Sequence, residues 1–172
     1  MRVSEQPLIT AGAIAARVVE LGRELAAEYG GRRPLLLGVL KGASLFFADL
    51  ARALPIELEI DFVQARSYKG TRSTGSVALS RAEDIEVTGR HVIVVEDIVD
   101  TGHTAAVLLA RLRALSPASL TLCTLLDKPS RRETDVHPDR TGFTIENHFV
   151  VGYGLDYEGL YRNLPAVHVM EE

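Results

Sequence analysis

The most constraining feature of the sequence is the stretch of residues 91–107, which reads HVIVVEDIVDTGHTAAV. It contains a run of β-branched residues at 92–95, which is typical of a strand buried on both faces in a parallel sheet. Glu96 and Asp97 are expected to end this strand, at the edge where open α/β sheets bind their ligands. A polar turn and the apolar stripe of a helix follow. The stretch therefore predicts a strand, a ligand-binding turn and a helix in succession.

The turn at residues 100–104 has the composition of a phosphate site. Gly102 permits a tight turn and a close approach of a ligand to the backbone, and either Thr101 or Thr104 is expected to cap the helix. The free amides at a helix start favour a phosphate. The two acids before the turn suit sugar hydroxyls and a metal ion. No GxxxxGK[ST] pattern is present, so an ATP-binding loop of that kind is excluded. The expected ligand carries both a phosphate and a ribose diol.

Length and composition indicate one packed domain without a general nucleic-acid or membrane surface. The chain has 172 residues, of which 47% are hydrophobic, and its net charge is −4. That charge argues against general binding to nucleic acids or anionic membranes. Cys123 is the only cysteine, which excludes an intrachain disulfide. The start lacks a signal peptide, and no apolar run approaches the roughly 18 residues of a membrane span. A reducing cytoplasm is therefore expected.

Apolar periodicity predicts further strands and helices along the chain. We expect helices over residues 10–29 and 45–54, and strands over residues 34–40, 56–63, 77–79 and 119–126. Lys41 and Gly42 follow one of these strands, and Lys128 follows another, so both groups are expected at the same sheet edge as the acids. Residues 66–76 are too polar and Gly-rich for a core. They fit either a mobile hairpin tip or a lid that closes over an anionic ligand.

The string VVEDIVDTGHT resembles the phosphoribosyl pyrophosphate (PRPP) motif of the type I phosphoribosyltransferases, in detail that of the hypoxanthine-guanine phosphoribosyltransferases. Further matches are LKG at residues 40–42, the pair Ser67 and Tyr68, FVVGYGLDY at residues 149–157, Lys128 and Arg162. The resemblance covers nearly the whole chain from Pro34 onward. It implies a single α/β domain with a twisted, mainly parallel sheet flanked by helices. The core would span residues 34–127, and a small hood would combine the N-terminal segment with residues 128–172.

The resemblance also implies an activity, a metal and a set of site residues. The reaction would transfer the 5-phosphoribosyl group from PRPP to hypoxanthine or guanine, releasing pyrophosphate and forming IMP or GMP, with Mg²⁺ held by Glu96, Asp97 and Asp156. Asp100 would be the general base, and Ser67 and Tyr68 would lie on a catalytic loop. The PRPP-binding residues would be Lys41, Gly42, Glu96, Asp97, Asp100, Thr101, Gly102, His103, Thr104 and Arg162. The purine-binding residues would be Ile98, Lys128, Phe149, Val150 and Asp156.

Several alternatives stay open at the level of sequence. The same fold serves regulators that sense PRPP or nucleotides and bind RNA or DNA, and transferases that prefer xanthine or a pyrimidine. Phe149 is as compatible with core packing as with stacking on a base. His103 would contact the phosphate through its ring, with a pH-sensitive affinity, or only through its backbone amide. The family suggests a homo-oligomer, a dimer or a tetramer.

Overall fold

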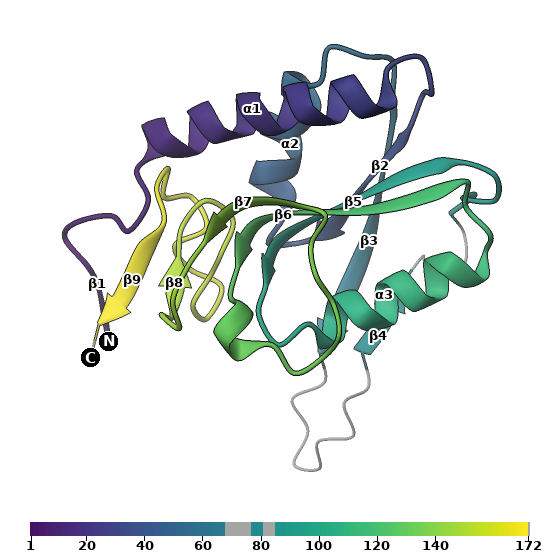
Figure 1. Cartoon of the computed structure of the whole chain (residues 1–172). Helices are drawn as coiled ribbons and strands as arrows, with labels where there is room; N and C mark the ends of the chain where they lie inside the picture. Colours follow the sequence, from purple (N-terminus) through teal and green to yellow (C-terminus); the bar gives the residue numbers. More distant parts are fainter. Residues whose placement is uncertain (68–76, 81–84, 172) are drawn as a thin grey trace.

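The computed structural model describes residues 1–67, 77–80 and 85–171, which form two sheets, three α-helices and a short 3₁₀ helix (Pro129–Arg131) (Figure 1). The large sheet has the strand order β4-β3-β2-β5-β6-β7, and the small sheet has the order β1-β9-β8. The helices are α1 (Ala11–Tyr29), α2 (Ser44–Ala53) and α3 (His103–Ala114). The strands are β1 (Arg2–Val3), β2 (Leu35–Leu40), β3 (Glu59–Ser67), β4 (Val77–Ser80), β5 (His91–Val99), β6 (Ser119–Asp127), β7 (Arg140–Thr144), β8 (Val150–Val151) and β9 (His168–Glu171).

The large sheet is parallel except at one edge. Strands β3, β2, β5, β6 and β7 run parallel to their neighbours, and β4 pairs with β3 in the antiparallel sense. The mainly parallel α/β architecture expected from the sequence is confirmed. The strand order reverses at β2, because the chain goes from β2 to β3 on one side and then returns to β5 on the other. Ligands of open α/β sheets bind at such a switch point, beyond the carboxyl ends of the strands.

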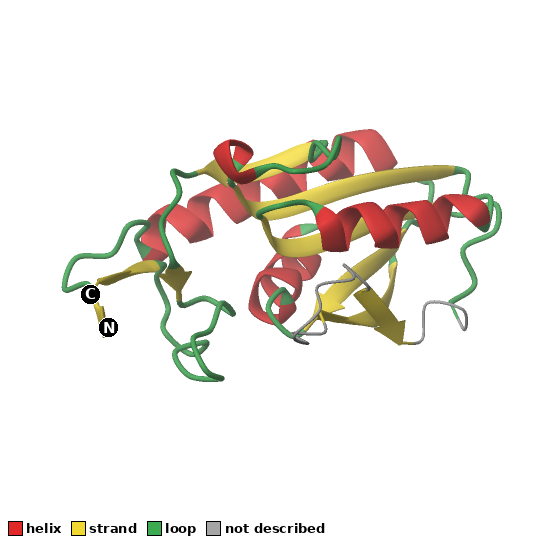
Figure 2. Ribbon diagram, turned by 90° about the horizontal axis from the view of Figure 1, so that it is seen from below, coloured by secondary structure: helices red, strands yellow, loops and turns green. Residues whose placement is uncertain are grey.

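Helices cover both faces of the large sheet (Figures 1 and 2). Successive residues of a strand point to opposite faces, so each central strand must be apolar on both sides. On β5, Ile93 is buried in the cluster that contains α1 and α2, whereas Val94 is buried in the cluster that contains α3. This double burial explains why the strand sequence is a continuous apolar run instead of an alternating one.

Strand β5 is longer than its apolar run. The sequence predicted an end at Glu96, but the strand continues to Val99. Pairing with β2 stops at Gly38 opposite Val95, whereas pairing with β6 continues until Val99 lies opposite Asp127. The prediction was wrong because the ladder with β6 holds the acidic residues in strand geometry. On its β2 side, β5 opens a crevice at that same point.

The small sheet lies at one end of the large sheet and joins the two ends of the described chain (Figure 2). Arg2 is opposite Glu171, and Val150 is opposite Val169. Two segments that the sequence placed outside the core nevertheless belong with the large sheet. Strand β7 is its edge strand, and α1 packs against that edge. The division into a core and a hood at residue 128 therefore does not follow sheet membership.

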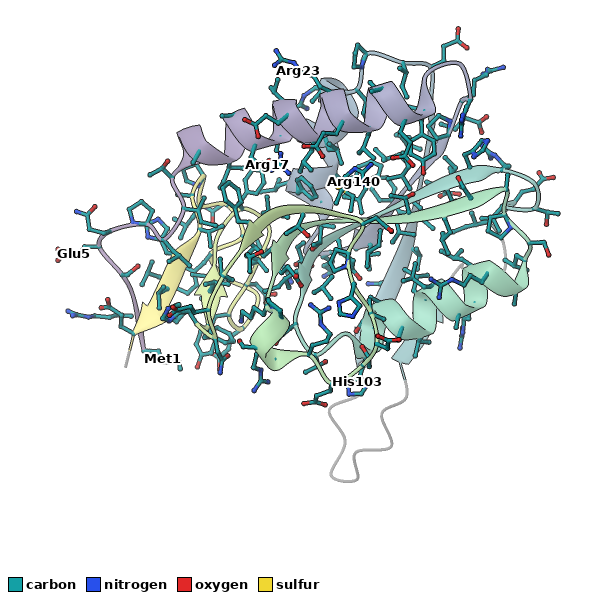
Figure 3. All side chains as sticks on the ribbon, in the orientation of Figure 1. Met1, Glu5, Arg17, Arg23, His103 and Arg140 are labelled. Carbon is teal, nitrogen blue, oxygen red and sulfur yellow. The ribbon has the colours of Figure 1, made fainter. Side chains whose placement is uncertain are left out.

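Charged side chains attach α1 to β7. The Arg17 guanidinium donates to the carbonyl oxygens of Thr141 and Gly142, at 2.9 and 3.2 Å, and Arg140 pairs with Glu28 at 2.8 Å. Figure 3 shows Arg17 and Arg140 between the helix and the strand. In the described ranges, no helix has the length and apolar character needed to span a membrane.

Candidate active site

A cavity of about 310 Å³ opens between the carboxyl ends of β2 and β5. Its walls come from the loop after β2, the end of β5, the start of α3 and the segment after β8. Most of the residues predicted to bind ligands line it, namely Lys41, Gly42, Glu96, Asp97, Ile98, Asp100, Thr101, Gly102, Thr104, Asp156 and Arg162. The topological switch point thus brings together three sequence segments, of which the one after β8 was linked to the other two only by resemblance.

The two acids on β5 are largely removed from water. Glu96 is 5% exposed, and its pKa lies well above the usual range. Burial is the main cause because it disfavours the ionised form, and the neighbouring charge of Asp97 adds to the effect. Burial likewise raises the pKa of Asp97 to about 6, although backbone hydrogen bonds, including that from the Ile98 amide at 3.0 Å, and the charge of Arg162 oppose the rise. A divalent cation would relieve the repulsion between these two carboxylates.

Gly42 lies between two other parts of the site. A Cβ atom at this position would lie 1.7 Å from Oδ2 of Asp97, so only glycine fits without a shift. Gly154 approaches from the other side, since a Cβ there would lie 2.0 Å from the Gly42 carbonyl oxygen. The peptide bond between Leu40 and Lys41 is cis. The loop after β2 is therefore in direct contact with both β5 and the segment after β8.

The start of α3 differs from the expected side-chain cap. Gly102 occupies the N-cap position itself, with φ +89°, and no side chain caps the helix. The prediction that Thr101 or Thr104 caps α3 was wrong, because Gly102 adopts the left-handed conformation that lets the chain turn directly into the helix. The first amides of α3 are left for another acceptor. Together with the helix dipole, they favour an anion in the adjoining cavity.

The segment after β6 fixes the loop between β5 and α3 through its carbonyl groups. Three backbone carbonyl oxygens accept hydrogen bonds from this segment. The Lys128 amide donates to that of Val99 at 3.0 Å, the Arg132 Nε to that of Asp100 at 3.0 Å, and the Glu133 amide to that of Thr101 at 2.9 Å. In a planar trans peptide bond, the N–H of one residue points opposite to the C=O of the residue before it. The amides of the following residues are therefore aimed away from this segment.

Arg132 is the residue of this segment that the sequence interpretation missed. Its buried guanidinium also donates to the carbonyl oxygens of Val99 and Val136 and pairs with Asp127. Two adjacent arginines after a strand were visible in the sequence, but nothing separated a buried arginine from ordinary surface charge. The structure shows that Arg132 holds the backbone of the loop, whereas Arg131 pairs with the Asp100 carboxylate.

Asp100, the predicted general base, lies between two cations. Its Oδ1 is 3.2 Å from Nε of Arg131, and its Oδ2 is 3.9 Å from Nζ of Lys128. Lys128 is only 4% exposed, and burial lowers its pKa while the charge of Asp100 opposes that change. A buried ammonium beside the site is a strong hydrogen-bond donor, and it would suit a ligand oxygen.

The segment after β8 supplies the remaining charged groups. Arg162 NH2 lies 2.5 Å from Oδ1 of Asp156, and Arg162 NH1 donates to the Gly154 oxygen at 2.6 Å. The other oxygen of Asp156 accepts from the Gly159 amide at 2.8 Å. The structure therefore brings Asp156 and Arg162 together and fixes both against the same turn.

The remaining predicted residues lie around the cavity or outside the described residues. Phe149 is 48% exposed, which excludes core packing for its ring. The ring lies edge-on to that of Tyr157, with 5.7 Å between the ring centroids. Val150 is buried in β8. The His103 ring pairs with Glu133 at 2.9 Å on the outer side of α3 (Figure 3). Ser67 ends β3, and Tyr68 lies outside the described residues.

The donor set suits an oxygen-preferring cation. In the described part of the chain, no three His, Cys, Asp or Glu side chains converge as a complete metal cage. Mg²⁺ in phosphate-handling sites typically takes one or two carboxylates together with substrate oxygens and water. Glu96 and Asp97 meet that need. Asp156 is a weaker candidate for direct contact, because both of its oxygens already accept hydrogen bonds.

Known proteins with this arrangement decide the family. The phosphoribosyl transferase domain family matches residues 8–158. A hypoxanthine-guanine phosphoribosyltransferase from Lactococcus lactis is 45% identical over 97% of the chain and 91% of its own length. The chain belongs to the hypoxanthine-guanine phosphoribosyltransferase family. A hypoxanthine-guanine-xanthine phosphoribosyltransferase of this family, from Tritrichomonas foetus, is 42% identical over 98% of the chain and 92% of its own length.

Solved structures of the family share the whole architecture. A Bacillus anthracis hypoxanthine-guanine phosphoribosyltransferase, with a HEPES molecule in its active site, aligns with a TM-score of 0.92 and 38% identity over 99% of the chain and 100% of that structure. Some relatives are longer. The chain is 44% identical to the bifunctional protein TilS/HprT of Listeria monocytogenes. The match covers 97% of the chain but only 26% of TilS/HprT.

Proposed function

We propose that this chain transfers the 5-phosphoribosyl group from PRPP to hypoxanthine or guanine, with IMP or GMP and pyrophosphate as products. One observation carries the proposal: a single cavity joins the buried Glu96 and the partly buried Asp97, the amides at a helix start and two cations, Lys41 and Arg162. The acids suit ribose hydroxyls, the amides suit the 5-phosphate, and the cations suit pyrophosphate. Names of the family members support the same reaction.

Mg²⁺ is the proposed cofactor, with Glu96 and Asp97 as the residues that would hold it. When bound, the ion would neutralise charge on the pyrophosphate. Lys41 and Arg162 act on the same charge from the protein, because both line the cavity beside these acids. Lys128 would donate to the exocyclic oxygen of a 6-oxopurine, with Phe149 against the ring. Ile98, Val150 and Asp156 complete the proposed purine site.

Asp100 is the proposed general base, which would accept the proton from the imidazole-ring nitrogen of the purine. It lines the cavity next to Lys128, the proposed base-recognition residue, with 3.9 Å between their charged groups. Proton transfer by a positioned side chain typically contributes about 10²- to 10⁴-fold in rate. Asp100→Asn keeps the shape of the side chain and replaces the carboxylate, which would accept the proton, with a neutral amide.

The test is a panel of bases with PRPP and Mg²⁺, measured for the parent and for Asp100→Asn. We expect turnover of hypoxanthine or guanine, and a loss of about 10²-fold or more in the variant with nucleotide binding retained. Asp135→Asn, a change of a fully exposed aspartate, is the matched control. Xanthine belongs in the panel because the Tritrichomonas foetus relative is named for it. Full turnover by Asp100→Asn would contradict the assignment of the base.

The oligomeric state and the cellular location stay predictions. A homo-oligomer, dimer or tetramer, is expected, and light scattering on the purified protein measures its mass in solution. A cytoplasmic location also stays a prediction. These relatives are named as phosphoribosyltransferases, and their names do not favour a nucleic-acid-binding regulator.

A further inference from the structure

Tyr153 occupies an unusual turn just outside the cavity. It lies between Gly152 and Gly154, and all three residues have positive φ, at 101°, 49° and 102°. A non-glycine residue rarely adopts this conformation unless its surroundings hold it. The side chain is only 7% exposed, and its hydroxyl donates to Oδ2 of Asp49 on α2 at 2.5 Å.

This hydrogen bond links the two loops that supply the pyrophosphate cations. Helix α2 directly follows the Lys41 and Gly42 loop, so Asp49 belongs to the same unit as that loop. Tyr153 adjoins Gly154, whose amide donates to the Arg162 oxygen at 3.0 Å and whose oxygen accepts from the Arg162 guanidinium. Gly154 also touches the Gly42 carbonyl, as its forbidden Cβ position shows. The Tyr153 hydroxyl is thus a second attachment beside a backbone contact.

The chemistry of the pair favours a stable bond. Burial, followed by the hydrogen bond and the charge of Asp49, raises the pKa of Tyr153, so its hydroxyl stays protonated and donates at all ordinary pH values. Its acceptor is a carboxylate, which makes the hydrogen bond charge-assisted and stronger than a neutral one. The other carboxylate oxygen of Asp49 pairs with Arg52 and keeps the acceptor oriented.

We propose that Tyr153 and Asp49 are positioning residues that set the spacing between Lys41 and Arg162, and hence the affinity for the pyrophosphate group. The proposal rests on the proposed function. Neither residue lines the cavity in the described part of the chain, so neither acts on the reacting atoms directly. The base side should be less sensitive to the pair, because Phe149 and Val150 are held by pairing with β9, and Asp156 is the one proposed purine residue that pairs with Arg162.

The experiment compares Tyr153→Phe with Tyr29→Phe. Both changes remove one hydroxyl with a 2.5 Å hydrogen bond, but the partner of Tyr29 is Thr121, in the core between α1 and β6. We expect Tyr153→Phe to raise KM for PRPP and the inhibition constant of pyrophosphate about 3- to 30-fold, which is less than the full loss of one hydrogen bond to a charged group because the backbone contact between Gly154 and Gly42 remains. KM for hypoxanthine should change much less than KM for PRPP. Tyr29→Phe should lower thermal stability similarly without either kinetic change.

Asp49 variants keep the test decisive if Tyr153→Phe folds poorly. Asp49→Asn retains an oxygen acceptor without its charge and should fall between the parent and Tyr153→Phe, whereas Asp49→Ala should match Tyr153→Phe. In the double variant, the two effects should not add, as expected for partners in one bond. Equal kinetics for Tyr153→Phe and Tyr29→Phe would overturn the positioning role. A parent protein with no turnover of any base would instead refute the proposed function.

Discussion

At the residue scale, Asp97 couples the stability of the fold to the occupancy of the site. Its pKa rises from 3.8 to about 6, first because the carboxyl is buried. A carboxyl with a raised folded-state pKa holds its proton more tightly in the folded protein. Its contribution to stability is complete below about pH 3.8 and is lost as the pH rises through about 6. At neutral pH the ionised carboxylate therefore opposes folding and favours a bound cation.

We predict that Asp97→Asn stabilises the metal-free protein at pH 7.5 by about 1–3 kcal/mol, since a neutral amide removes the buried charge. The gain over the parent should disappear towards pH 4, where Asp97 is protonated. Urea unfolding across this pH range, with a chelator present, measures both effects. The control is Glu57→Gln on the exposed surface, which should give no such pH-dependent difference. A gain that persists at pH 4 would contradict the assignment to the Asp97 charge.

At the scale of elements, local patterns predicted the strands and helices but not the contacts between them. The apolar patterns predicted β2, β6, α1 and α2 nearly to the residue, since burial imposes those patterns. The strand expected over residues 56–63 instead runs over Glu59–Ser67. The end of β5 was wrong because the ladder with β6, and not local composition, decides it.

The candidate site shows the same limit. The residues of the PRPP motif could be named from the sequence because they are contiguous. Arg132 and the pair of Tyr153 and Asp49 could not, because their partners are distant in sequence and their residue types are common elsewhere. Burial is what distinguishes them, and a sequence without its fold does not reveal which arginine or tyrosine is buried.

Arg132 offers a test of how the loop before α3 is supported. Arg132→Met should lower the free energy of unfolding by about 3–5 kcal/mol, because it leaves the buried Asp127 without its cation and several carbonyl groups without donors. In any fraction that folds, affinity for PRPP should fall more than affinity for hypoxanthine. Urea unfolding and calorimetric titration measure the two effects. Arg23→Met, an exposed change on α1, should alter neither, and an equally small effect at Arg132 would show that the loop needs no such support.

At the scale of the whole molecule, the central strands are enclosed so completely that a chemical probe should report on global opening. Cys123 on β6 is fully buried between neighbouring strands and the helical layer. Burial raises the pKa of its thiol to about 12, so almost no thiolate forms at neutral pH. Access to this sulfur requires that the large sheet separates from its helices.

We therefore expect native protein at pH 8 to react with an aromatic disulfide reagent many times more slowly than unfolded protein. PRPP with Mg²⁺ should slow the reaction further, because ligands that bind only the folded state reduce opening. Absorbance of the released thiol measures the rate, and the same protein in concentrated urea gives the reference. Rapid labelling of native protein would show that β6 opens locally without global unfolding.

The pairing of β1 with β9 joins residues from opposite ends of the described sequence, and β8 depends on β9 for its own partner. A nascent chain that has emerged only as far as β7 already contains every strand of the large sheet, the acid pair and helix α3. It lacks the strand that supports Phe149 and the turn that carries Arg162. During synthesis, the acid pair, the start of α3 and Lys128 should therefore assemble before Phe149 and Arg162 are in place, and a stalled chain would hold an incomplete form of the proposed site.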